Sequence, residues 1–182
     1  MKPELDNETY ENESFRGEDL SGVVTRNCTF HACDFTNARL NGSEHVGSDF
    51  ANSRLENVNL FGASFEDCRL LGVDFTAAVL TGMTIVRGDL SYAVLRGQDL
   101  SGIDLREVKA HEADFSESDL SDADLRHADL SRARLHNTQL RGADLREANL
   151  DGVDLAAALV AGAKLDLAGA VQLARSLGAD VD

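Results

Sequence analysis

A large apolar residue recurs at every fifth position through almost the entire chain. The frame is clearest in residues 113–135, ADFSESDLSDADLRHADLSRARL, where it falls on Phe115, Leu120, Leu125, Leu130 and Leu135. It continues without an insertion over residues 10–155 and is interrupted three times, by Thr25, His45 and Ala110. A helix would space apolar residues by 3.6 and a half-buried strand by 2, so neither element explains the pattern. A constant period over so long a stretch is typical of repeat architectures.

The remaining positions of each pentad have preferences of their own. Two residues before the large apolar residue the side chain is usually small, as at Ala123 and Ala128. One residue before it Asp dominates, as at Asp124 and Asp129. Each pentad therefore has two residues suited to an interior and three suited to a surface. The 182 residues, of which 43% are hydrophobic, are enough for one domain with a continuous core.

The pentads "ADFSE", "ADLRH", "ADLSR", "ADLRE" and "ANLDG" resemble the consensus A-(D/N)-L-X-X of the pentapeptide repeat family. The resemblance covers residues 8 to about 165. It implies an all-β fold, a right-handed quadrilateral β-helix with one pentad per side and four per coil. Residues 20 apart would then stack, and residues 10–165 would make nearly eight coils, a rod about 38 Å long at about 4.8 Å per coil.

The two ends of the chain depart from the pattern. Within a predicted β-helix domain of residues 1–165, residues 1–14 are expected to form an irregular N-terminal cap, because Glu8 and Glu13 occupy the small position. Residues 166–182 are expected to form a capping and dimerisation helix with a tail, which Asp166 begins and Gly178 ends. One face of that helix carries the candidate dimerisation residues Leu167, Val171, Ala174 and Leu177.

The chain is strongly acidic, with 17 Lys and Arg against 32 Asp and Glu and a formal charge of −15. This charge argues against direct binding to nucleic acid or to an anionic membrane, and it suits a partner with a basic surface. Solubility alone is the alternative reason for it. The sequence shows no signal peptide and no apolar run of membrane-spanning length, so we expect a cytoplasmic protein.

Residues that could carry chemistry are few, and we expect neither an enzyme nor a cofactor. Cys28, His31 and Cys33 offer a metal-like grouping, but both cysteines occupy the small inward position, which favours buried thiols over a metal site. Thr25 and His45 would stack as a polar spot in the core, either as a locally bonded histidine or as a ligand site. Phe61 should point outward, as an incidental exposed residue or as an anchor for a partner.

A narrower resemblance extends over essentially the full chain. The stretches "ESFRGEDLSGVVTRNCTFHACDF", "SEHVGSDF" and "KLDLAGAVQLARSLG" are similar to the mycobacterial, fluoroquinolone-resistance (MfpA-like) branch of the family. This resemblance implies a homodimer joined at the C-terminal region, whose rod mimics duplex DNA. Such a rod would bind the DNA-binding surface of the DNA gyrase A subunit, inhibit supercoiling and lower fluoroquinolone susceptibility. The alternative is an interaction scaffold for another basic protein.

The charge density supports the DNA-mimic hypothesis. Fifteen net charges along about 38 Å give about one per 2.5 Å, against about one per 1.7 Å in duplex DNA. The predicted partner-binding surface lies where acidic residues concentrate, at Asp99, Asp104, Glu117, Asp119, Asp122 and Asp124. Arg106, Arg126 and Arg146 should partly neutralise the column of Asp104 and Asp124. Outward Asp could also serve only local backbone hydrogen bonds.

Overall fold

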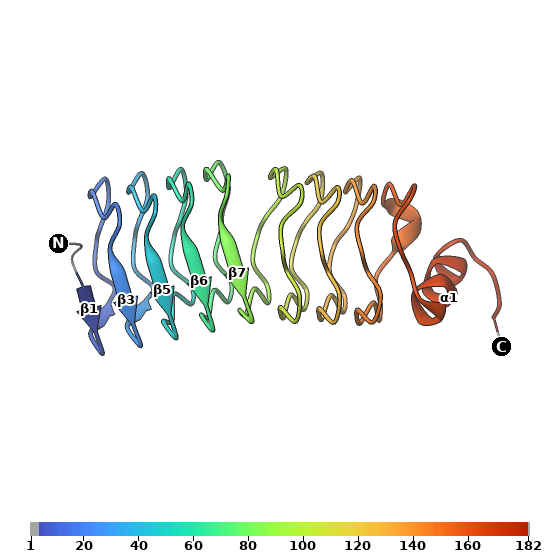
Figure 1. Ribbon diagram of the computed structural model, residues 1–182, viewed down its shortest axis with the longest axis horizontal. Coiled ribbons are helices and arrows are strands. Elements are labelled where there is room, and N and C mark those ends of the chain that lie inside the picture. Colours follow the sequence, from blue (N-terminus) through green and yellow to red (C-terminus); the bar gives the residue numbers. More distant parts are fainter. Residues whose placement is uncertain (1–3, 182) are drawn as a thin grey trace.

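Residues 20 apart in the sequence lie beside one another along most of the molecule, a computed structural model that describes residues 4–181. One five-stranded parallel sheet has the order β1-β3-β5-β6-β7, and a two-stranded parallel sheet pairs β2 with β4 (Figure 1). The strands are β1 (Glu4–Asp6), β2 (Thr9–Glu11), β3 (Val24–Arg26), β4 (Thr29–His31), β5 (Glu44–Val46), β6 (Ser64–Glu66) and β7 (Thr84–Val86).

The second half of the rod continues the same register as single parallel bridges. Asp104 pairs with Asp124, Asp124 with Asp144 and Asp144 with Lys164. From Glu4 to Lys164 the chain winds through eight coils, each made of four pentads. The predicted right-handed quadrilateral β-helix is therefore confirmed, and the five-residue period is explained by one pentad on each of four sides.

The corners of the coil explain the preferences of the outward positions. At a corner such as Leu120–Ala123, the N–H of the small residue donates to the carbonyl of the large apolar residue, at 3.1 Å. The second residue after the apolar one has positive φ, for example +58° at Asp122 and +74° at Gly142. This left-handed conformation favours Gly, Asn and Asp, which recur there.

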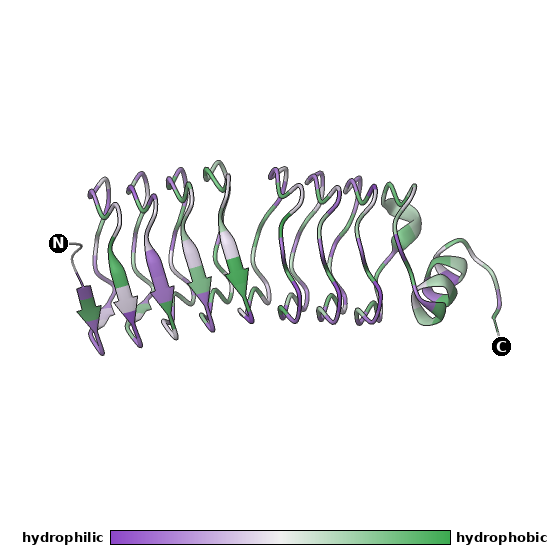
Figure 2. Ribbon diagram, in the orientation of Figure 1, coloured by the Kyte–Doolittle hydropathy of each residue, from purple (hydrophilic) through white to green (hydrophobic). Residues whose placement is uncertain are grey.

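The core is a column of large apolar residues with small ones between them. Hydrophobic and hydrophilic residues alternate along the coils, as expected for side chains that point in and out by turns (Figure 2). Aromatic rings stack one coil above another, with centroids 4.8 Å apart for Phe15 and Phe35 and 4.8 Å apart for Phe30 and Phe50. Leu125 is 1% exposed. Every fifth residue thus supplies the continuous core that no single coil could provide.

Thr25 and His45 form a polar group in the core, and His45 is locally hydrogen-bonded, which is one of the two roles that the sequence predicted for it. His45 Nδ1 lies 2.8 Å from Thr25 Oγ1, and its Nε2 lies 2.8 Å from Ser43 Oγ. Its ring stacks on Phe65 with centroids 4.6 Å apart. Burial lowers the pKa of His45 to about 3, so the ring is neutral near pH 7 and both nitrogens are satisfied.

The N-terminal coil is more regular than the sequence predicted. Irregular winding was expected over residues 1–14, of which residues 1–3 lie outside the described part. Instead β1 pairs in register with β3, which places Leu5 beside Thr25, and β2 pairs with β4, which places Tyr10 beside Phe30. The prediction was wrong because the ladder bonds use backbone groups and do not require Ala at the small position. Glu8 and Glu13 are exposed on the open edge, where charges discourage edge-to-edge association.

The C-terminal segment forms the predicted helix. After the 3-10 turn η1 (Leu155–Ala157), helix α1 (Leu167–Ser176) begins where the Asp166 carboxylate accepts the Gly169 N–H at 2.9 Å. Gln172 Nε2 donates to the Val153 carbonyl at 2.7 Å, which ties the helix to the last coils. No helix in the described part of the chain has the length and apolar character needed to cross a membrane. Residue 182 lies outside that part.

The backbone ladder is interrupted in the middle of the rod (Figure 1). One coil earlier, Leu60 and Gly62 donate to carbonyls of the next coil at 2.9 and 3.0 Å. Among the described residues, the equivalent N–H groups of Leu80 and Gly82 have no backbone acceptor. We call this interruption, between residues 77–87 and residues 96–106, the seam. The opposite sides stay paired, for example through the 2.6 Å bond from Leu90 to the Lys109 carbonyl.

Two oversized residues explain the seam. Met83 and Ile103 occupy the small inward position in consecutive coils on either side of the seam, whereas the neighbouring coils carry Ala63 and Ala123 there. A close-packed interior resists the extra volume, so the coils separate on this side. The sequence contains this signal, but the fifth-residue pattern does not reveal it.

Candidate acidic docking face

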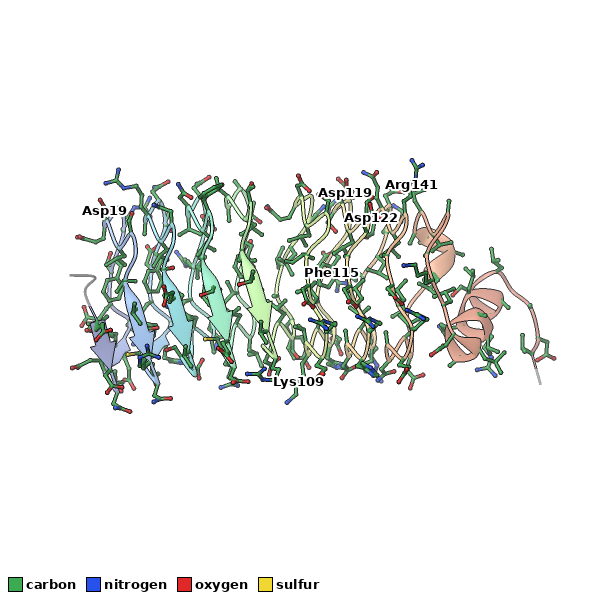
Figure 3. All side chains as sticks on the ribbon, viewed as in Figure 1. Asp19, Lys109, Phe115, Asp119, Asp122 and Arg141 are labelled. Carbon is green, nitrogen blue, oxygen red and sulfur yellow. The ribbon has the colours of Figure 1, made fainter. Side chains whose placement is uncertain are left out.

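One face of the rod presents carboxylates without a matching row of basic residues. We call it the acidic face and define it by Asp99, Asp119 and Asp122, which lie outside the inward residues Leu100 and Leu120. Asp99 and Asp119 are bridge partners in consecutive coils. Asp119 and Asp122 project from the same edge of the rod, which also carries Arg141 of the following coil (Figure 3). The five-residue period therefore turns separate Asp residues into one row.

Local hydrogen bonds fix the orientation of two of these carboxylates, those of Asp99 and Asp119. Asp99 Oδ1 accepts the N–H and the hydroxyl of Ser101 at 3.1 and 2.7 Å, which lowers the pKa of Asp99. Asp119 Oδ1 accepts the Ser121 N–H at 2.8 Å. Within the described residues, Oδ2 of Asp99 and Oδ2 of Asp119 have no hydrogen-bond partner. Each carboxylate is thus held by one oxygen and offers the other outward.

The acidic face also lacks compensating cations. No ion pair is formed by Asp99, Asp119 or Asp122 with any residue in the range 4–181. Arg141, on the same edge of the rod in the following coil, also forms no ion pair within that range. Three carboxylates therefore keep their charge available to a partner.

The neighbouring column of carboxylates is neutralised, as predicted. The Arg106, Arg126 and Arg146 guanidinium groups each lie 2.6 Å from the carboxylate of the Asp two residues earlier, at Asp104, Asp124 and Asp144. The hydrogen bond from Arg146 lowers the pKa of Asp144 to about 2. Asp104 and Asp124 were among the candidate site residues, and both are engaged by their own arginines.

The sequence-based assignment of Glu117 needs a correction. Glu117 is one of the residues predicted to offer its charge to a partner, but its carboxylate pairs with the Arg96 guanidinium of the preceding coil. Arg96 and Glu117 are 21 residues apart in the sequence, so they lie in adjacent coils. The coil-to-coil register is the signal that would have found this pair.

Exposed apolar side chains lie on the same face, on the N-terminal side of the seam. Phe61 is 57% exposed and Val79 is 46% exposed, so the predicted outward position of Phe61 is confirmed. The N–H of Leu60, the residue before Phe61, donates to the Val79 carbonyl. Phe61 and Val79 therefore lie in adjacent coils. The face thus changes from apolar to acidic across the seam.

The predicted dimerisation stripe is open at the end of the rod. Leu167 and Leu177 are exposed, and Val171 and Ala174 are half-buried. A hollow of about 620 Å³ between α1 and the last coils is lined in part by Leu150, Leu167 and Val171. Apolar residues therefore remain available at this end.

The cysteines and histidines form no metal-binding group of three or more with acidic residues anywhere in residues 4–181. Cys28 and Cys33 are buried, as predicted, and their thiols contact main-chain carbonyls, at 3.4 Å from Arg26 O and 3.6 Å from His31 O. The thiols are thus placed as core side chains.

Comparisons with known proteins agree with this geometry. A search of curated proteins returns no match. Among solved structures, a trypsin-treated variant of QnrB1, described as a plasmid-mediated fluoroquinolone resistance protein, matches with a TM-score of 0.88 and 26% identity, covering 100% of this chain and 91% of that one. Full-length QnrB1 matches with a TM-score of 0.82 and 24% identity, covering 97% of each chain. The family model "Pentapeptide repeats (8 copies)" matches residues 46–82, 89–126 and 118–156. The chain belongs to the pentapeptide repeat family.

Proposed function

We propose that this protein binds DNA gyrase in place of DNA, through the DNA-binding surface of the A subunit, and thereby inhibits supercoiling and lowers fluoroquinolone susceptibility. The observation that carries the proposal is the row of uncompensated carboxylates on the acidic face. The likeness to QnrB1 over the whole chain supports it, because that protein is described as a fluoroquinolone resistance protein. Three unpaired cysteines suit a reducing compartment, so we place the protein in the cytoplasm.

The physical basis is electrostatic substitution for DNA. A surface that binds duplex DNA is lined with Lys and Arg, and binding is driven in large part by the release of counterions. A rod whose net charge density is of the same order as that of DNA could occupy such a surface. Asp99 and Asp119, one coil apart, would stand in for successive phosphates. No chemical step is required of the protein, which acts by occupying the site.

Neutralising the acidic face is expected to weaken the inhibition of gyrase. In the triple variant Asp99→Asn, Asp119→Asn and Asp122→Asn, the amide oxygens at positions 99 and 119 can still accept the local backbone hydrogen bonds, and Asn tolerates the positive φ of position 122, so the fold should be unchanged. Loss of three charges, each contributing on the order of 0.5–1.5 kcal/mol against a Lys or Arg, should raise the concentration needed for half-inhibition of supercoiling roughly 10-fold or more. The logarithmic dependence of binding on salt should also become shallower.

A matched control removes the same net charge elsewhere. The variant Asp104→Asn, Asp124→Asn and Asp144→Asn also loses three negative charges, but from carboxylates that arginines already engage. Its inhibition should therefore fall less. Equal potency of the parent and the acidic-face variant across a salt series would contradict the position of the site. A parent that does not inhibit gyrase would contradict the function and favour a scaffold for another basic partner.

We also propose that two chains associate through α1, which would double the length of the rod. The exposed Leu167 and Leu177, with Val171 and Ala174 between them, supply an apolar stripe that a second copy could cover. Val171→Glu with Leu177→Glu should convert a dimer into a monomer in sedimentation velocity, while the circular dichroism of the β-helix stays the same. Sedimentation of the parent itself as a monomer would refute this proposal.

A further inference from the structure

The seam opens a cleft on the acidic face, in the middle of the rod. Its volume is about 320 Å³, and both coils that flank the interruption line it. Its walls include the apolar side chains of Leu80, Met83, Leu100 and Ile103. Asp99 lies at its edge, with Oδ2 free of any hydrogen bond in the described part of the chain. The cleft therefore combines an apolar interior with a carboxylate.

Main-chain groups in the cleft are also unpaired. The N–H groups of Leu80 and Gly82 face the cleft without a backbone acceptor in the described part of the chain. In the regular ladder the equivalent N–H donates to a carbonyl of the next coil, as that of Leu60 does to Val79. Across the seam the corresponding acceptors are the carbonyls of Asp99 and Ser101, and neither accepts a backbone hydrogen bond within residues 4–181. Two carbonyl oxygens are thus available beside the free carboxylate oxygen, and polar groups left in this state favour a partner that can satisfy them.

The composition of the cleft matches one kind of side chain. Lysine and arginine combine an aliphatic stem, which packs on apolar surface, with a cationic end that only donates hydrogen bonds. An anionic side chain would be repelled by Asp99, and a neutral polar side chain would leave the charge of Asp99 uncompensated. The seam has a second, smaller cleft of about 190 Å³ around the corner, where Arg87 and Arg106 balance the charges of Asp104 and Glu107, so that no net negative charge is left there to attract a cation. A cation is therefore expected to enter from the acidic face.

We propose that the cleft at the seam receives a lysine or arginine side chain of the basic partner. The stem would lie along Met83 and Ile103, and the charged end would bind Asp99 Oδ2 and the carbonyl oxygens of Asp99 and Ser101. This inference rests on the proposed function, because gyrase is the partner whose basic surface would supply the side chain. It gives the acidic face one recess that fixes the position of the partner along an otherwise repetitive rod.

Closing the cleft by a reversible cross-link tests the proposal without changing the charge. Thr81→Cys with Ser101→Cys places two outward cysteines on either side of the seam. A closed coil spacing of about 4.8 Å lies within the Cα separation of about 4.4–6.8 Å that a disulfide spans. After oxidation with glutathione disulfide, confirmed by mass spectrometry, this variant should need at least 10-fold more protein for half-inhibition of gyrase. Reduction with dithiothreitol should restore its potency.

The matched control places the same pair of cysteines in intact coils of the same column, away from the recess. Ser21→Cys with Asn41→Cys bridges the first two coils, where the Gly22 N–H already donates to the Asn41 carbonyl at 2.9 Å. Its oxidation should leave inhibition unchanged within 2-fold. If the parent inhibits gyrase and the cross-link at the seam has no effect, or if both cross-links weaken inhibition equally, the cleft is not the recess we propose. Failure of the parent to inhibit gyrase would instead overturn the proposed function.

Hydrogen exchange gives a second test that needs no cross-link. In the free protein the amides of Leu80 and Gly82 should exchange at least 10-fold faster than those of Leu60 and Gly62, which have acceptors. Bound gyrase A subunit should slow exchange at Leu80 and Gly82 at least 10-fold by filling the cleft. Exchange at Leu80 and Gly82 that is unaffected by a saturating concentration of the bound subunit would overturn the proposal.

Discussion

Leu125→Asp is expected to unfold several coils of the rod. Leu125 is 1% exposed and stacks between Leu105 and Leu145, which are 2% and 0% exposed. Leu125→Ala should cost about 2–5 kcal/mol through lost burial and the cavity left behind. The aspartate loses the same contacts and in addition buries a charge without a partner, which costs several kcal/mol more. The total is comparable with the stability of a typical domain, about 5–15 kcal/mol.

Thermal denaturation followed by circular dichroism measures the effect. Asn137→Asp is the matched control, because it adds the same charge in the same coil at an exposed corner where φ is +56°. Aspartate adopts this conformation elsewhere in the chain, at Asp122. The control should melt within a few degrees of the parent, whereas Leu125→Asp should lack a cooperative transition. A Leu125→Asp variant that melts like the parent would show that position 125 is not in the core.

The sequence predicts most of the fold because the large apolar residue at every fifth position is the one whose side chain points into the core. The phase of this pattern holds without an insertion, so assigning Leu125 to the core also assigns the other large apolar residues of its own coil and those of the coils stacked on it. The regular winding of the first coil was missed for a related reason. Its backbone follows the ladder, while Glu8 and Glu13 reflect the solvent at an open edge rather than a change of structure.

The details of the acidic face were less predictable, because they depend on side-chain pairs between coils. The pairing of Asp104 with Arg106 is local and could be predicted. The pairing of Glu117 with Arg96 joins two coils and needs the coil-to-coil register together with the reach of an arginine. The seam depends on volume, since Met83 and Ile103 satisfy an apolar pattern and violate only its size rule.

The stability of the protein is expected to fall in acid because of His45. The ring contacts Thr25, Ser43, Phe50 and Phe65, and no charged group within residues 4–181 bonds to it; burial lowers its pKa from 6.5 to about 3. Between these two values the unfolded chain binds a proton that the folded protein does not. The free energy of unfolding is therefore unaffected by His45 above pH 6.5, and it decreases as the pH falls from 6.5 toward 3. At about 1.36 kcal/mol per pH unit the loss approaches about 5 kcal/mol at pH 3.

Urea unfolding at pH 7 and pH 4 isolates this contribution when the parent is compared with Thr25→Val combined with His45→Leu. The double variant replaces the titrating ring with the leucine that the repeat prefers, and it removes the hydroxyl that would lose its partner at 2.8 Å. Carboxylates such as Asp144 destabilise both proteins in acid to the same extent, so they cancel in the comparison. Between pH 7 and pH 4 the parent should lose about 3 kcal/mol more than the variant. Parallel losses in the two proteins would mean that His45 can be protonated in the folded state, and the enclosed, uncharged environment assigned to it would then be wrong.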